Sequence, residues 1–159
     1  MTQENLRDYT LRITQASQSE LVVIMFDIIL SDIEDAKEDY RMLRIDDYVK
    51  DLRHAQKFVQ ELMSVLDYSF SISYALMSLY VFVRKTLVAA EIGRRPEKLD
   101  HAVSVLEKLR TGFVGVSEQD KSGPVMQNAQ QVYVGMTYGH GTLNESVIDA
   151  SDYKRGFTA

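Results

Sequence analysis

The first 92 residues contain neither glycine nor proline, the two residues that most strongly interrupt helices. All eight glycines occur from Gly93 onward, and the two prolines are Pro96 and Pro124. Apolar residues recur every three or four positions through the same region, which is the period of a helix with one buried face. The chain is therefore expected to fold into long helices.

Start signals and apolar spacing predict four helices, near residues 19–43, 47–67, 71–92 and 96–116. The starts are marked by a capping box, by polar caps and by a proline suited to a first helical turn; the residues are Ser17 with Glu20, Asp46 or Asp47, Ser71 or Ser73, and Pro96. Short connections make sequential helices antiparallel.

The predicted fold class is all-α, an antiparallel up-down four-helix bundle. We expect an N-terminal cap segment over residues 1–18, the bundle over 19–116 and a C-terminal tail extension over 117–159. An apolar, amide-rich stretch of the tail, VMQNAQQVYVGM over 125–136, is predicted to lie in an apolar groove of its own or a neighbouring molecule.

The charge and composition limit the kinds of partner. A net charge of -5 provides no general attraction for nucleic acid or an anionic membrane, so neither is expected as a partner. The apolar uncharged run over residues 68–83 is too short and too polar to cross a bilayer. The N-terminus has no apolar signal region, which predicts a cytoplasmic protein. The chain has no cysteine, so disulfides and thiolate sites are excluded.

Two of the expected helices have more apolar surface than a bundle core needs. On the third, one stripe consists of Ile72, Leu76, Leu79, Val83, Leu87 and Ala90, with a second apolar face opposite. On the first, a continuous stripe consists of Val22, Phe26, Ile29, Ile33, Ala36 and Tyr40, and further apolar residues lie off it. The residues predicted to bind a partner through these extra faces are Leu21, Ile24, Ile28, Tyr74, Met77, Val81 and Val88.

The sequence offers no convincing catalytic, cofactor or metal site, and none is predicted. The pairs Asp51-x-x-His54 and Glu97-x-x-x-His101 are common on exposed helix surfaces. One alternative is a histidine phosphotransfer bundle, since His54 is followed by Lys57. In such bundles glycine usually follows the lysine, whereas Phe58 stands here and would crowd the imidazole. Another alternative is a structural bundle whose extra faces form a homodimer.

With the helices placed, residues 9–113 resemble the flagellar export chaperones of the FliS family in order and spacing. The matching positions are Tyr9, Ala16-Ser17, Glu20-Leu21, Ile24-Met25-Phe26-Asp27, Ala55 through Glu61-Leu62, Leu66-Asp67, Leu79-Tyr80, Arg84, Leu87, Ala90, Leu106 and Leu109-Arg110. The chain departs from the family at Gln18, where a proline is usual, at Ile28, where a glycine is usual, and at Phe113, which replaces a tryptophan.

The resemblance implies a non-enzymatic chaperone that binds the disordered C-terminal segment of flagellin and prevents premature polymerisation before export. It also implies that the N-terminal segment can cover part of the client surface, so Tyr9, Leu11 and Ile13 are candidates for a displaceable cap. The flagellar export apparatus is a further expected partner. Self-association through the apolar faces or the tail stays open at this point.

Overall fold

The computed structural model describes residues 3–126, and every regular element in this range is helical. The elements are α1 (Gln3–Gln15), α2 (Gln18–Arg41), α3 (Ile45–Ser64), α4 (Ile72–Gly93), the 3₁₀ turn η1 (Pro96–Lys98) and α5 (Leu99–Ser117). The predicted all-α fold is confirmed. The tail segment over 125–136 that was predicted to fill a groove lies almost entirely outside the described residues.

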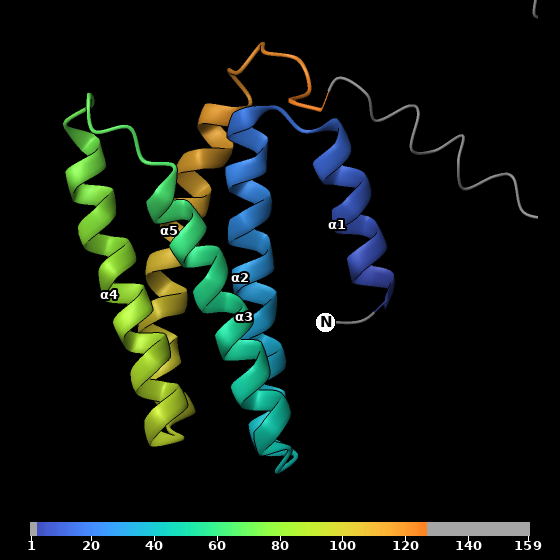
Figure 1. Ribbon diagram of the computed structural model, residues 1–159, viewed down its shortest axis with the longest axis vertical. Coiled ribbons are helices and arrows are strands. Elements are labelled where there is room, and N and C mark those ends of the chain that lie inside the picture. Colours follow the sequence, from blue (N-terminus) through green and yellow to red (C-terminus); the bar gives the residue numbers. More distant parts are fainter. Residues whose placement is uncertain (1–2, 127–159) are drawn as a thin grey trace, which may run out of the picture. The chain divides into compact units, whose positions relative to one another are not determined.

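Helices α2 to α5 form the bundle, and successive helices run in opposite directions (Figure 1). Each packs against two neighbours, in the pairs α2 with α3, α3 with α4, α4 with α5, and α5 with α2. Helix α1 lies outside this group and packs on α2. No helix within residues 3–126 is long and apolar enough to span a membrane.

The core is built from one stripe of each bundle helix. The fully buried members are Phe26, Ile29, Ile33 and Ala36 of α2, Tyr48, Leu52, Ala55, Val59 and Leu62 of α3, Tyr80, Val83, Leu87 and Ala90 of α4, and Leu99, Ala102 and Leu106 of α5. The one polar atom of Tyr48 is satisfied inside this core, because its hydroxyl donates to the backbone oxygen of Ala90 at 2.8 Å.

The core-facing side of α4 is rotated from the predicted one. Ile72 and Leu79 were assigned to the core stripe, but both side chains are exposed, whereas Tyr80 is almost completely buried. Helix α4 is apolar around most of its circumference, so spacing alone identifies no unique core direction. The contacts with α3 and α5 decide it.

The predicted helix starts are partly confirmed. Ser17 and Glu20 form the capping box in both directions at the start of α2. Helix α3 begins earlier than expected, at Ile45, so the prediction that Asp46 or Asp47 caps it is wrong and both lie in its first turn.

The remaining two starts also differ in detail. Ser71 occupies the N-cap position of α4 but makes no capping hydrogen bond there. The hydroxyl of Ser73 instead donates to the backbone oxygen of Asp67 at 2.5 Å. Pro96 opens η1, a separate turn that leads into α5.

Candidate functional site

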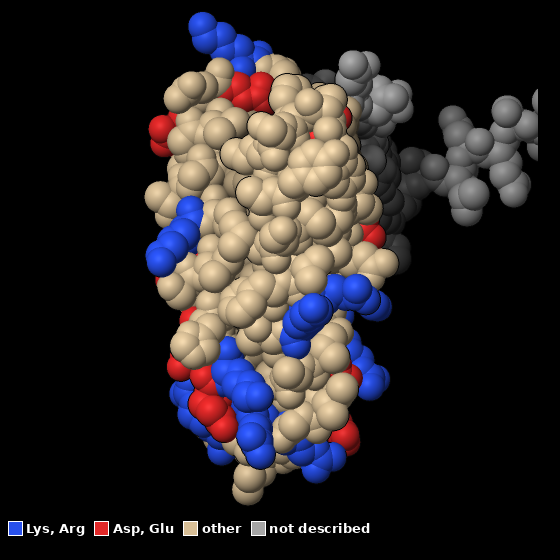
Figure 2. Space-filling model, turned by 90° about the vertical axis from the view of Figure 1, so that its left-hand side faces the viewer, with Lys and Arg blue, Asp and Glu red and all other residues tan. Residues whose placement is uncertain are grey.

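An uncharged apolar surface covers the α3–α4 connection and the first half of α4. Its large side chains are 38 to 65% exposed, and they are Tyr68, Phe70, Ile72, Tyr74, Leu79 and Phe82. We call these six residues the α4 patch. In Figure 2, the upper part of the face that contains α4 shows a broad area without Lys, Arg, Asp or Glu. A contiguous apolar surface of this kind is typical of interaction sites, whereas single exposed apolar residues are common on any protein.

Of the four α4 residues predicted to bind a partner, Tyr74 belongs to this patch. Its ring packs edge-on against Tyr68, with the ring centroids 5.4 Å apart. Met77, Val81 and Val88 are half-buried and do not belong to the fully buried core. They can contribute only part of their surface to a partner.

Sequence reasoning missed five members of the patch, namely Tyr68, Phe70, Ile72, Leu79 and Phe82. The signal that identifies them is the uncharged run over residues 68–83, whose side chains are too numerous for one core stripe. The sequence does predict a second apolar face on this helix, but it places Ile72 and Leu79 on the opposite stripe.

The predicted α2 residues lie elsewhere, under α1. Ile24 and Ile28 are only 3% and 4% exposed, and Leu21 is partly buried beside them. The side chains that cover them are Tyr9, Ile13, Ala16 and Phe58, which pack with them as a second apolar cluster. In Figure 1, α1 and α4 are on opposite sides of the bundle, so the structure does not bring the two predicted sets together.

An ion-pair network fastens α1 to the bundle. The Asp27 carboxylate of α2 accepts from Arg12 Nη2 of α1 at 2.6 Å and from Arg110 Nε of α5 at 2.5 Å. The Arg12 guanidinium also lies 5.7 Å from the centre of the Tyr9 ring. Burial, followed by the charge of Asp27, raises the pKa of Tyr9. Leu11, the third residue predicted for the cap, is exposed and does not belong to the cluster.

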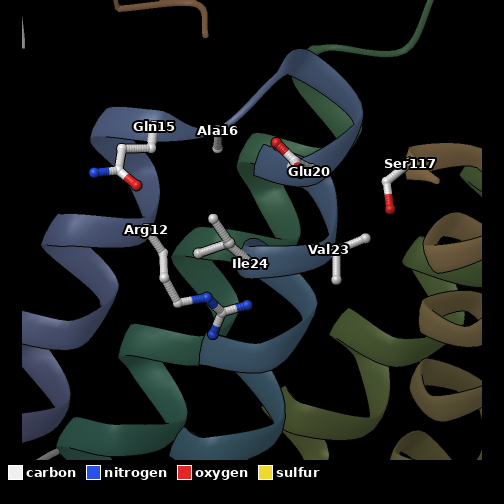
Figure 3. A pocket seen from close by; sticks show the side chains of 7 residues that line it. All are labelled: Arg12, Gln15, Ala16, Glu20, Val23, Ile24 and Ser117. Atoms are coloured by element: carbon white, nitrogen blue, oxygen red, sulfur yellow. The ribbon is translucent and has the colours of Figure 1, made fainter. Parts of the chain in front are cut away.

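The packing of α1 leaves a pocket of about 300 Å³ near the α1–α2 junction (Figure 3). Its lining is partly polar and consists of Arg12, Gln15, Ala16, Glu20, Val23, Ile24 and Ser117. The pocket reaches the side of Ile24, a residue of the cluster under α1. Helix α1 therefore does not fill the space between α2 and the end of α5.

The segment after α5 returns to the same junction. The backbone N–H of Val125 donates to the Ala16 oxygen at 3.1 Å, and the Ser19 hydroxyl donates to the Asp120 carboxylate. Hydrogen bonds from Ser122 and then Ser19 hold the pKa of Asp120 well below its usual range. The start of α2 is thus fixed by residues from both ends of the described chain.

His54 is engaged within the bundle rather than presented alone. Its Nδ1 lies 2.7 Å from Asp32 Oδ2, and its ring packs edge-on against Phe58 with centroids 5.1 Å apart. Burial raises the pKa of Asp32 to about 6, against the lowering effect of His54. The expected crowding of the imidazole by Phe58 is present. Across residues 3–126, no group of three or more His, Asp or Glu side chains is placed to hold a metal ion.

The chain was compared with curated proteins and with protein-family models. No curated protein matches the chain. The family model described as "Flagellar protein FliS" matches residues 2–120, which span α1 to α5 and the beginning of the returning segment. The family predicted from the sequence is confirmed: this chain belongs to the FliS family of flagellar export chaperones.

Proposed function

We propose that this chain is a cytoplasmic, non-enzymatic chaperone that binds the C-terminal segment of flagellin and keeps it from polymerising before export. Family membership supports the chaperone role. The observation that carries the client site is the α4 patch, six large apolar side chains without a charged residue among them. A disordered client segment cannot bury enough apolar surface on its own. It is stabilised when it folds against such a surface.

The size of the α4 patch implies that it needs a second surface. Fully burying a large apolar side chain is worth about 1.5–3 kcal/mol, so covering six that are roughly half exposed is worth about 5–9 kcal/mol. Association itself costs about 4–15 kcal/mol in lost translational and rotational freedom. The patch alone is therefore marginal, and a tightly held client is expected to use further apolar area.

The α2 cluster under α1 is the second surface that we propose. Ile24 and Ile28 are buried in the free protein, where Tyr9 and Ile13 of α1 pack over them together with Ala16 and Phe58. A client segment of similar apolar character can replace these two side chains if it also compensates for the Arg12–Asp27 ion pair. Displacement of α1 would then couple client binding to the opening of the N-terminal helix.

Isothermal titration with flagellin tests the proposal, using intact flagellin and a form that lacks the disordered C-terminal segment. The informative variant is Ile72→Asp, which places a charge in the α4 patch near the N-terminus of α4, where the helix dipole tolerates an acid. The matched control is Ile92→Asp, in the same helix but outside the patch, at a side chain that is 78% exposed.

We expect intact flagellin to bind, the truncated form not to bind, and Ile72→Asp to weaken affinity at least about tenfold, or 1.4 kcal/mol. Ile92→Asp should leave affinity unchanged, and circular dichroism should show wild-type helix content for both variants. Equal affinity for the two flagellin forms would contradict the proposed client segment. Sedimentation without flagellin addresses the homodimer alternative, in which the patch would be covered by a second copy.

A further inference from the structure

A groove with a basic rim lies between α4 and the start of α5. It is beside the second half of α4, whereas the α4 patch begins just before the N-terminus of that helix. It encloses about 430 Å³ and is lined by Phe82, Lys85, Thr86, Ala89, Lys98 and His101. Phe82, Thr86 and Ala89 follow one another at helical spacing along α4 and form the floor. Lys85 stands on α4, whereas Lys98 of η1 and His101 of α5 stand on the other side.

The lysines of this groove are not neutralised by the protein. Among the ion pairs of the described chain, none involves Lys85 or Lys98. Two neighbouring acids are already engaged elsewhere, since Glu91 binds Arg53 of α3 and Asp100 binds Lys37 of α2, each at 2.7 Å. Figure 2 shows several Lys and Arg side chains, with some Asp and Glu side chains beside them, over the lower part of the face that contains α4. The charged side chains that line the groove are both lysines, although the net charge of the protein is -5; Glu97, next to Lys98 in the sequence, is not among the lining residues.

The shape of the floor favours a helical occupant. Thr86 and Ala89 are small, so the backbone of a partner can approach α4 closely, while the exposed ring of Phe82 offers an apolar contact at one end of the groove. The volume accommodates one or two side chains rather than a whole helix. An amphipathic helix laid along the groove would insert apolar residues spaced three or four apart and leave its flanks beside the lysines.

We propose that the α4–α5 groove is a docking site for an acidic amphipathic helix of another protein. Apolar side chains of that helix contact Phe82, Thr86 and Ala89, and its Asp or Glu residues pair with Lys85 and Lys98. A second copy of the chain related by a two-fold axis through the groove is disfavoured, because it would place these lysines opposite their own counterparts. The groove shares Phe82 with the α4 patch, but its other lining residues lie outside that patch, so the proposal does not rest on the client proposed there.

The test uses the full ¹⁵N-labelled chain and two synthetic peptides of about 16 residues, or four to five helical turns. Both peptides carry leucine on one helical face; one has glutamate on the flanks and the other has lysine at the same positions. Lys85→Glu/Lys98→Glu is the groove variant. The matched control, Lys57→Glu/Lys108→Glu, changes net charge equally at two exposed lysines outside the groove.

Amide chemical shifts should move around Phe82, Ala89 and His101 when the glutamate peptide is added, and not with the lysine peptide. The groove variant should weaken this binding about tenfold, the control variant should retain it, and added salt should weaken it because the pairs are exposed. Three results would overturn the proposal: equal binding of both peptides, equal binding to the groove variant, or the same shift changes produced by sodium sulfate alone. Shifts that depend on protein concentration without peptide would assign the groove to self-association instead.

Discussion

Replacing His54 by alanine should lower the free energy of unfolding, because it leaves the buried carboxylate of Asp32 without its partner. Asp32 is fully buried, its Oδ2 is bound by His54, and its Oδ1 has no hydrogen-bond partner among residues 3–126. Without the imidazole, the ionised carboxylate would retain neither a counter-charge nor a bond at these two atoms. Leaving a buried charged acceptor unpaired costs about 1–3 kcal/mol or more, so the free energy of unfolding should fall by that amount at pH 7.

The pH dependence of this loss distinguishes it from a simple packing defect. Burial raises the pKa of Asp32 from 3.8 to about 6, although His54 lowers it, and this difference corresponds to about 3 kcal/mol. A group whose folded pKa is raised stabilises the fold fully below its unfolded pKa and loses that contribution as pH rises through the folded value. Removing His54 raises the Asp32 pKa further, so the deficit of the variant should shrink as pH falls from 7 to about 5.

Urea denaturation of wild-type protein and His54→Ala across this pH range measures the difference, because all titrating groups except His54 itself are common to both. In an Asp32→Asn background, where residue 32 carries no charge, His54→Ala should cost less than about 1 kcal/mol. The reasoning is refuted if the deficit at pH 7 stays below about 0.5 kcal/mol, or if it is the same at pH 5 and in the Asp32→Asn background.

Two further predictions concern the N-terminal region. Ser17→Ala removes the acceptor for the Glu20 N–H in the capping box and should lower the free energy of unfolding by about 1 kcal/mol in urea denaturation, whereas Ser71→Ala, at an N-cap without a capping bond, should have a smaller effect. Arg12→Gln breaks the ion pair of α1 with Asp27 and should accelerate hydrogen exchange in α1 but not in α3; unchanged exchange in α1 would show that apolar packing alone holds that helix.

Much of the bundle could be predicted because its helices have a single apolar side. On α3, the apolar residues that recur every three or four positions from Tyr48 to Leu62 are all buried, since the rest of that helix is mostly polar and leaves one orientation. On α4, apolar residues surround the helix, and the exposed Ile72 and the buried Tyr80 could be distinguished only through the neighbouring helices. The same ambiguity hid most of the α4 patch.

The N-terminal region could be predicted only in part. Tyr9 and Ile13 do pack over Ile24 and Ile28, but the helical form of α1 was not predicted from its mostly polar sequence. The Asp27 ion pairs join three separate helices, so no local pattern reveals them. The basic groove could not be predicted for the same reason, because Lys85 and Lys98 come to line one groove only through the turn between α4 and η1.

The bond between Ser19 and Asp120 has a consequence for the order of events during synthesis. Its two residues lie 101 positions apart, and the Val125 contact with Ala16 spans a similar length. At translation rates of about 5–20 residues per second, the start of α2 emerges from the ribosome about 5–20 s before the segment that clasps it. During that interval α1 and α2 are available to pack without the clasp, which forms only once the last described part of the chain has been made.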